Sequence, residues 1–567
     1  MARELENRLS SILAWGALAV TILVTDRISL DPVNVGKMLL LSIVALSVFP
    51  IILIQRKDLV IRNRVLLFAQ LTFILLAFIS IFTSDNAFER GLYGAFGRNT
   101  GLLTYTCLVI LFLAATLFSL NQSFDKIILS LFLAGILNII YCLLVVSGND
   151  FLTWNNTYNA VLGTFGNPNF IGAFMGIFFT LLIVQILNPK SVVKIKLLLG
   201  ALLPFVIAVI YFSHALQGIL VAASGSVLAL YFLIRSKQRL AKASVIFLTG
   251  VFGIGFLALL GIIQKGPLAT ILYKPSVTFR GEYWKAGINM GEENPLTGVG
   301  IDSYGTYYRT FREQSATIKP GLETVTDTAH NVYLDIFAGL GFPGLLTFII
   351  INMFVLFIAL RHLHKFKDFD ARFLSIFLCW TMYQLQSIIS INQIGLAIWG
   401  WLLGGLIIAY VHSYPKRNLD NEKIYSRRNV KKKHIKNQRD ELIDASTTLK
   451  ILLGAVVGLL VALPSFVVDV QVRNALYGKG DSSSVVAVAK MWPADNVRLN
   501  RIFVALAEKR QNQEARDLTV FSISKFPNDY PSWRALYLLT LDGVPEKVTI
   551  KNKLHEIDPF NPEYFEK

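Results

Sequence analysis

Long apolar runs separated by short polar connections constrain this chain more than any other feature. A helix needs about 20 residues to cross the hydrocarbon core of a bilayer. Because every backbone N–H and C=O group in hydrocarbon needs a partner within its own segment, each such run is predicted to be a helix. Thirteen runs reach or approach that length, near residues 10–25, 36–54, 65–82, 101–120, 126–147, 169–187, 194–212, 216–234, 243–264, 341–360, 371–389, 395–412 and 450–468.

The composition agrees with lipid as the main solvent. Apolar residues make up 54% of the chain and charged residues only 16%, whereas soluble proteins carry about 25% charged residues. The net charge of +17 would favour nucleic-acid binding if it gathered on one soluble face. The Lys and Arg residues instead occupy short connections, where they determine topology and meet anionic lipid head groups, so nucleic-acid binding is the weaker interpretation.

Positive charge alternates along the chain and predicts its orientation. The connections 83–100, 148–168 and 213–215 are poor in Lys and Arg. The alternate connections are basic, at 55–64, 190–196, 235–242, 361–372 and 416–439. By the positive-inside rule the N-terminus is cytoplasmic, and thirteen spans then place the C-terminal region outside. The sequence therefore predicts an all-α polytopic membrane protein with about thirteen transmembrane helices.

Three segments interrupt the pattern of spans and divide the chain. Residues 265–339 form a polar extracytoplasmic loop within a membrane domain at 1–412, and loops of this length are usually functional. Residues 413–449, with Lys431–Lys433, are predicted to be a disordered cytoplasmic linker beside anionic lipid, before the last span at 450–468.

The last segment, 469–567, changes character. Its apolar residues recur at helical spacing, with breaks at Pro493, Pro527 and Pro559. We predict four or five antiparallel extracytoplasmic helices of tetratricopeptide type. An unrelated small helical bundle is the alternative.

Two polar turns of the predicted outer face contain candidate binding residues. Asn167 and Pro168 predict a helix start, and Asn169 can cap the helix that follows. These groups either only cap the helix or leave helix N–H groups exposed to an anionic ligand. In the turn 213–218, His214 and Gln217 either satisfy backbone groups or line a site.

The long loop carries the richest set of candidates. Arg280 and Trp284 lie four residues apart and share a helix face, where a guanidinium can hold phosphate beside a ring that packs on sugar or lipid. Arg309 and Arg312 form a second cationic face. Surface arginines are commonly only solvated, which is the alternative for each of them.

His330 stands where the polar loop meets an apolar helix, followed directly by Asn331. An imidazole in this position can accept a proton near neutral pH. A histidine that merely caps the helix is the alternative. The three cysteines all fall within apolar runs, and no pair of them has metal-ligand spacing.

Four motifs in this order resemble the O-antigen ligase/polymerase superfamily over roughly residues 160–412. They are Gly-Asn-Pro-Asn at 166–169, Arg-x3-Trp at 280–284, Asn-Pro-Leu-x-Gly-x-Gly at 294–300, and His-Asn-x2-Leu at 330–334. Members of that family are multi-pass glycosyltransferases of the bacterial inner membrane with a large periplasmic loop. Some of them carry a tetratricopeptide-like tail.

The resemblance implies a GT-C-like fold and transfer of a glycan from an undecaprenyl or other polyprenyl diphosphate carrier, without a metal or cofactor. His330 would act as the catalytic base and Arg280 would stabilise the diphosphate, followed by Arg312 and Arg309. Substrate-binding roles are expected for Trp284, Asn331, Asn167, Asn169, His214 and Gln217. The chain departs from the family at Gly339, where members usually have glutamate, and at Ser213–Gly218, where many have Ser-Arg-Gly.

Several alternatives stay open at this point. The acceptor can be a lipid core, a growing glycan or a protein, and the tail can present a protein partner. A transporter of polyprenyl-linked glycans is the alternative from another class, although transporters tend to carry charges within their spans, which are nearly absent here. A membrane anchor for the tail is a third interpretation, for which thirteen spans are more than needed.

Overall fold

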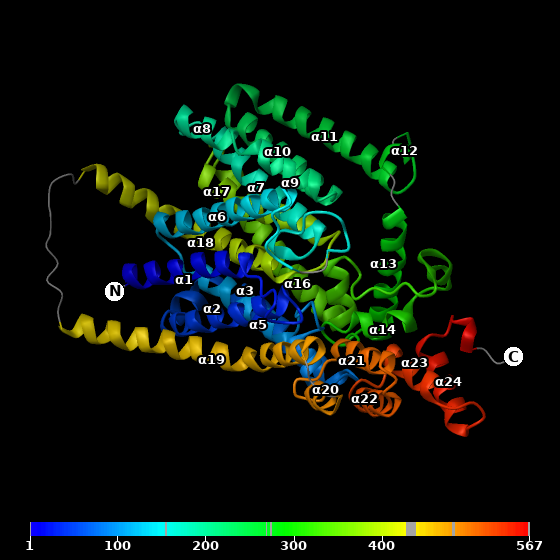
Figure 1. Cartoon of the computed structure of the whole chain (residues 1–567). Coiled ribbons are helices and arrows are strands. Elements are labelled where there is room, and N and C mark those ends of the chain that lie inside the picture. Colours follow the sequence, from blue (N-terminus) through cyan, green and yellow to red (C-terminus); the bar gives the residue numbers. More distant parts are fainter. Residues whose placement is uncertain are drawn as a thin grey trace.

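The computed structural model describes residues 2–153, 156–267, 269–272, 275–426, 438–478 and 482–564. Every regular element in these ranges is helical, so the protein is an all-α polytopic membrane protein (Figure 1). The membrane bundle consists of α1 (Ala2–Ile22), α2 (Asn34–Ile54), α3 (Arg56–Thr83), α4 (Phe88–Tyr93), α5 (Leu102–Ala115), α6 (Asn121–Val146), α7 (Pro168–Leu187), α8 (Val193–Gly200), α9 (Leu203–Phe212), α10 (Leu216–Ser236), α11 (Ala241–Ile262), α16 (Val332–Lys365), α17 (Ala371–Ser387), α18 (Ile394–Ser426) and α19 (Gln438–Tyr477).

All thirteen predicted runs fall on helices of this bundle, with α8 and α9 sharing one run. Within the described residues, nine helical segments are long and apolar enough to cross a membrane. The runs on α1, α5 and α17 lie in helices that are too short or too polar to meet that standard, and for the run on α11 only the apolar segment 242–257 can be assessed. The count of thirteen spans therefore stays a prediction.

The helix α18 runs through the centre of the bundle, since 94% of its apolar segment is buried. It packs against α5, α16 and α17. Its Trp399 is fully buried, and the indole N–H donates a hydrogen bond of 2.8 Å to the Thr21 hydroxyl of α1. Buried aromatic residues with a satisfied N–H give this centre a single packing arrangement.

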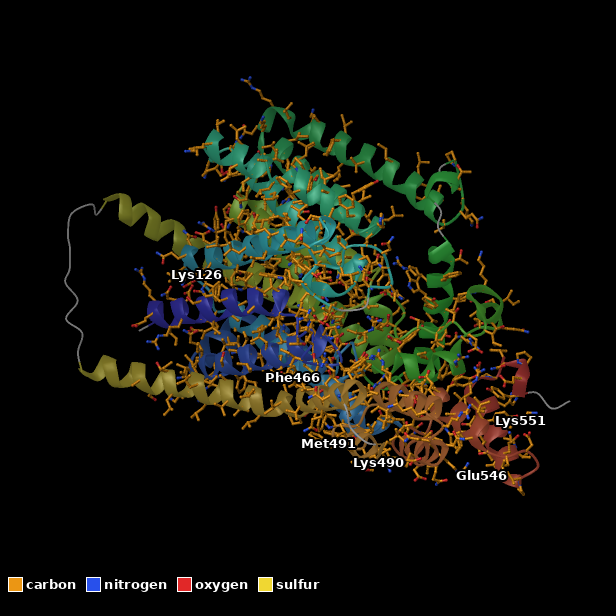
Figure 2. The ribbon with its side chains drawn as sticks, viewed as in Figure 1. Lys126, Phe466, Lys490, Met491, Glu546 and Lys551 are labelled. Carbon is orange, nitrogen blue, oxygen red and sulfur yellow. The ribbon has the colours of Figure 1, made fainter. Side chains whose placement is uncertain are left out.

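The connections predicted to be outer loops lie together at one end of the bundle, here called the loop end (Figure 1). The Asn34 amide at the start of α2 links two of them, because it donates to the Gly97 carbonyl and accepts from Gln393. Figure 2 places Lys126 of α6 at the opposite end from Lys490 and Lys551. Which of these two ends faces the cytoplasm stays a prediction from the alternation of charge.

The long connection between α11 and α16 contains short helices and folds over the loop end. Its elements are α12 (Ala269–Leu272), α13 (Pro275–Glu293), α14 (Tyr304–Phe311) and α15 (Gln314–Ala316). Helix α13 packs against the first part of α16. A break at Gly341, with φ of +64°, separates that first part from the rest of α16, which contains the predicted span 341–360.

Glycines of the Asn-Pro-Leu-x-Gly-x-Gly motif allow the loop backbone to lie directly on α16. The Val299 N–H donates to the Ala338 carbonyl at 2.8 Å, and the Gly300 N–H donates to the Gly339 carbonyl at 3.1 Å. A Cβ on Gly298 would overlap the Gly339 backbone, and one on Gly339 would lie 3.1 Å from the Gly300 oxygen. A side chain at position 339, where the resembling family usually has glutamate, would require a small shift of the Gly300 backbone.

The C-terminal tail is helical, as predicted, and lies beside the loop end (Figure 1). It consists of α20 (Ser482–Ala489), α21 (Asn496–Glu508), α22 (Asn512–Lys525), α23 (Tyr530–Leu539) and α24 (Pro545–Ile557). The helices end shortly before the three predicted breaks at proline. The tetratricopeptide assignment itself stays a prediction.

The helices on both sides of the predicted basic linker, 413–449, extend further into it than the apolar runs indicate. Helix α18 continues to Ser426, and α19 begins at Gln438. Residues 427–437, with Lys431–Lys433, lie outside the described residues. The disordered linker therefore stays a prediction for that segment.

Candidate functional site

His330 lies in the last turn of the long loop, directly before α16. Its φ of +53° is in the left-handed region, which a non-glycine residue adopts at an energetic cost and often at functional sites. Its backbone N–H donates to the Thr328 hydroxyl at 3.2 Å. The loop therefore holds the imidazole in a strained but defined position.

Asn331, and not His330, caps α16. Its side-chain oxygen accepts hydrogen bonds from the N–H groups of Tyr333 and Leu334 at 3.0 and 3.3 Å. This accounts for the free N–H groups at the helix start and leaves the His330 imidazole available for another task. The side-chain oxygen of Asn331 is already used to cap the helix, so it is not free for the substrate-binding role that was predicted.

The imidazole of His330 lies against α13 through an aromatic contact. The rings of His330 and Tyr283 stack with centroids 5.7 Å apart and an interplanar angle of 26°. Two tyrosines of α14 contact Tyr283. The Tyr304 hydroxyl donates to the Tyr283 carbonyl at 2.5 Å, and the Tyr308 ring packs edge-on against the Tyr283 ring. Helices α13 and α14 thus position the catalytic candidate.

The environment of His330 keeps its imidazole neutral. Burial, followed by the positive charges of Arg280 and Arg98, lowers its pKa to about 4, against an opposing effect of Asp327. The sequence predicted an imidazole that can accept a proton near neutral pH. In the structure, burial and two guanidinium groups disfavour its charged form. A neutral imidazole retains the lone pair that a general base needs.

Arg280 has no side-chain partner in the described part of the chain. It lies on α13 and is half-buried, and its guanidinium forms no hydrogen bond or ion pair with another described residue. Burial lowers its pKa from the usual range, an effect that Tyr283 opposes, yet an arginine stays charged in proteins. A half-buried, unpaired guanidinium is a ready site for an anion.

Trp284 borders the same site from the next turn of α13. Its side chain packs against the aromatic cluster of α13 and α14. The indole N–H is buried and has no hydrogen-bond partner within the described part of the chain. A buried donor without a partner is costly, so this N–H is a candidate contact for a substrate oxygen.

The structure adds Arg98, which sequence reasoning missed. Its guanidinium forms an ion pair of 3.2 Å with Asp327, three residues before His330. Asp302 holds the Arg98 loop in place by accepting from the N–H groups of Ala95 and Thr100 at 2.7 and 3.1 Å. The only signal in the sequence was that Arg98 is one of two basic residues in the connection 83–100, whose other residues are uncharged or acidic.

A small cavity of about 30 Å³ lies beside this ion pair. Its walls include Arg98, Asp302, Asp327 and the half-buried Asp335 of α16. The space is enough for about one water molecule. Polar side chains therefore line the space beside the ion pair.

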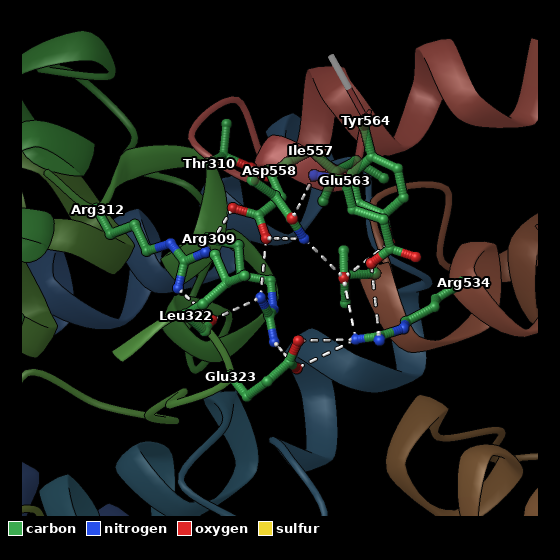
Figure 3. A network of polar contacts seen from close by, with 12 residues as sticks. Arg309, Thr310, Arg312, Leu322, Glu323, Arg534, Ile557, Asp558, Glu563 and Tyr564 are labelled. Carbon is green, nitrogen blue, oxygen red and sulfur yellow. Dashed lines mark hydrogen bonds and ion pairs between the residues drawn. The ribbon is translucent and has the colours of Figure 1, made fainter. Parts of the chain in front are cut away.

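Arg309 and Arg312 have a different task from the one predicted. Both guanidinium groups bind Asp558 of the tail, at 2.8 and 2.7 Å, and both donate to the Leu322 carbonyl (Figure 3). The side chains of Arg312 and Asp558 are fully buried. Because their charges are already paired inside the protein, these two arginines are unsuited to binding a diphosphate.

The remaining predicted residues form a second polar group at the loop end. Asn167 caps α7, since its side-chain oxygen accepts from the Asn169 N–H at 2.9 Å, so the cap is Asn167 where Asn169 was predicted. Gln217 is buried and donates to Gln386 at 3.1 Å, whereas His214 is exposed with φ of +54°. Among the described residues no hydrogen bond or ring contact joins these side chains to His330.

The site therefore unites a neutral imidazole, an unpaired half-buried arginine, a second arginine shared with a carboxylate, and an aromatic wall. Among the described residues no three or more His, Cys, Asp or Glu side chains gather at metal-binding distance. Metal independence stays a prediction. The arrangement is suited to stabilising negative charge beside a group that can accept a proton.

Comparison with known proteins agrees with this chemistry. Residues 201–349 match the family described as O-antigen ligase. The matched region contains Arg280, Trp284 and His330 together with both arginines of the Asp558 contact. No curated protein matches the chain. The family match supports a membrane protein that acts in glycan transfer.

Proposed function

We propose that this chain, with its region similar to O-antigen ligases, transfers a glycan from a polyprenyl-diphosphate carrier to an acceptor at the loop end. That end would face the outside of the bacterial inner membrane, with the N-terminus in the cytoplasm. The observation that carries the proposal is the unpaired, half-buried Arg280 in electrostatic contact with a neutral His330.

In this reaction the acceptor O–H or N–H attacks the anomeric carbon, and the bond from that carbon to the carrier diphosphate breaks. The diphosphate leaves with the bonding electrons. Arg280, with Arg98 beside it, stabilises the charge that develops there, an effect that is strong in a partly dry site. The acceptor proton goes to His330, which is worth roughly 10²–10⁴-fold in rate.

A weak base suits this chemistry. Transition states of glycosyl transfer resemble an oxocarbenium ion, so bond breaking leads and the nucleophile needs little activation. Binding of the anionic diphosphate would also offset the charges of Arg280 and Arg98. Because those charges lower the pKa of His330, the imidazole would become a stronger base when the donor is bound.

The acceptor stays open among a lipid, a growing glycan and a protein. The tail beside the site favours an acceptor or partner that is itself a protein over simple chain polymerisation. A transporter of polyprenyl-linked glycans is the candidate from another class, and it predicts movement of the donor across the membrane without bond cleavage.

The test uses the purified full chain in proteoliposomes with a polyprenyl-diphosphate glycan. We expect release of carrier diphosphate with the native chain and none with His330→Ala or Arg280→Ala, at equal membrane insertion. His364→Ala is the matched control, because His364 is exposed at the far end of α16. Full activity of His330→Ala would overturn the assignment, and glycan movement without release would favour the transporter.

A further inference from the structure

The tail is joined to the loop end by a buried set of charges, here called the Asp558 clamp: Asp558, Arg309, Arg312 and the Leu322 carbonyl (Figure 3). Asp558 follows the last residue of α24, and its N–H still donates to the Leu554 carbonyl. Each of its carboxylate oxygens accepts from a different arginine. One carboxylate therefore serves two guanidinium groups.

The interface around the clamp is extensive and closely packed. The Arg309 guanidinium lies 4.0 Å from the centre of the Tyr530 ring, and the Thr310 hydroxyl donates to the Ile557 carbonyl at 2.9 Å. At the more exposed rim, Arg534 of α23 binds Glu323 at 3.0 Å. Removing one partner of a buried ion pair leaves an uncompensated charge and is strongly destabilising, whereas an exposed pair matters little.

The clamp is connected to the catalytic candidate through α14. Arg309 lies in the last turn of that helix, and Arg312 directly follows it. Tyr304 and Tyr308 of the same helix hold Tyr283, which stacks on His330. A shift of α14 would therefore change the position of the imidazole.

A second contact joins the tail to the other wall of the site. Asp495, the N-cap of α21, binds the buried Arg90 at 3.2 Å and accepts from the Phe96 N–H at 3.1 Å. The Arg90 guanidinium also donates to Asn496 at 2.6 Å. Phe96 precedes Arg98 by two residues, so the tail holds both the α14 segment and the Arg98 loop.

We propose that the C-terminal tail is a positioning part of the catalytic unit and that Asp558 is its principal positioning residue. This rests on the proposed glycan transfer. The tail braces the two segments that carry the charged groups of the site, so it acts on turnover and not only on acceptor binding. A tail that served only as a docking module would affect the acceptor KM alone.

The test compares Asp558→Asn with Arg534→Gln in the full chain. The first keeps the shape and removes the buried charge, and the second breaks an exposed pair in the same interface. We expect Asp558→Asn to lower kcat on the order of 100-fold, as for a misplacement of about 1 Å, with donor KM little changed. Arg534→Gln should stay within about twofold of the native chain.

Hydrogen exchange gives a readout that does not depend on activity. Backbone amides of residues 278–290 and 326–336 should exchange about tenfold faster in Asp558→Asn and at the native rate in Arg534→Gln. If Asp558→Asn does not accumulate in the membrane, Arg312→Lys takes its place, because it keeps the charge and loses one of two contacts.

Native exchange and native kcat in the charge-removing variant would overturn the proposal, as would a change confined to the acceptor KM. If the native chain releases no carrier diphosphate, the proposed function fails. The exchange measurement would still decide whether the clamp positions the His330 segment.

Discussion

The imidazole of His330 lies nearly parallel to the phenol ring of Tyr283, with centroids 5.7 Å apart. The contact joins the end of the long loop to α13, the helix that also presents Arg280 and Trp284. It buries one face of the imidazole and brings the ring within the field of a guanidinium. This packing contact therefore helps to fix the position of the proposed base, while burial and the charges of Arg280 and Arg98 lower its pKa.

The first prediction concerns pH. The pKa of His330 is lowered to about 4 by burial and by Arg280 and Arg98, so the neutral form exists above that pH and is lost only as pH falls through it. The acid limb of kcat/KM should lie near pH 4, where an ordinary histidine would place it near about 6.5. A rate profile in proteoliposomes measures it, and a limb at 6.5 would contradict the environment described here.

The second prediction follows from the cause of that shift. Arg280→Gln removes the guanidinium whose charge lowers the pKa of His330 most, so the pKa of His330 should rise toward the ordinary value. Carbon NMR of labelled histidine can follow this titration, with His330→Gln used for assignment.

The third prediction concerns the glycine contact between loop and helix. Gly298→Ala would place a Cβ against the Gly339 backbone at a φ of +65° and should cost about 2 kcal/mol or more. Gly281→Ala on α13 is the matched control, because no atom lies within 4 Å of its new Cβ, and alanine there should gain up to about 1 kcal/mol. Thermal unfolding in detergent separates the two; equal melting temperatures would refute the close contact.

The fourth prediction tests the cap of α7. Asn167→Ala removes the acceptor for the Asn169 N–H and should destabilise the chain by about 1 kcal/mol. Asn169→Ala leaves that acceptor in place and should stay within about 0.5 kcal/mol. The reverse order would assign the cap to Asn169, as the sequence had predicted.

The fifth prediction concerns the Arg98 loop. Asp302→Ala removes the half-buried carboxylate that accepts from the buried N–H groups of Ala95 and Thr100, and leaving buried donors unpaired costs about 1–3 kcal/mol. Asp327→Ala breaks a more exposed pair with Arg98 and should cost at most about 1 kcal/mol. Unfolding midpoints compare the two, and a larger loss in Asp327→Ala would show that the loop is held from the His330 side.

Much of the architecture was predictable because its causes are local in the chain. A bilayer forces each long apolar run into a helix, and the positive charges show which connections share an end. The prolines at 493, 527 and 559 likewise predicted where the tail helices stop. His330, Arg280 and Trp284 were correctly placed on one loop, since they lie within 51 positions of each other.

What the sequence by itself determined is thus the helices, and it placed the candidate residues His330, Arg280 and Trp284 on one loop. Only the tertiary structure decided which charges are free to act. Arg312 and Asp558 are 246 residues apart, and Arg98 and Asp327 are 229 apart, so no local pattern reports that they meet. The physical reason is that a guanidinium has the same chemistry whether it is paired or not. Packing alone buries the charges of Arg309 and Arg312 against Asp558 and leaves Arg280 beside His330 without a partner among the described residues.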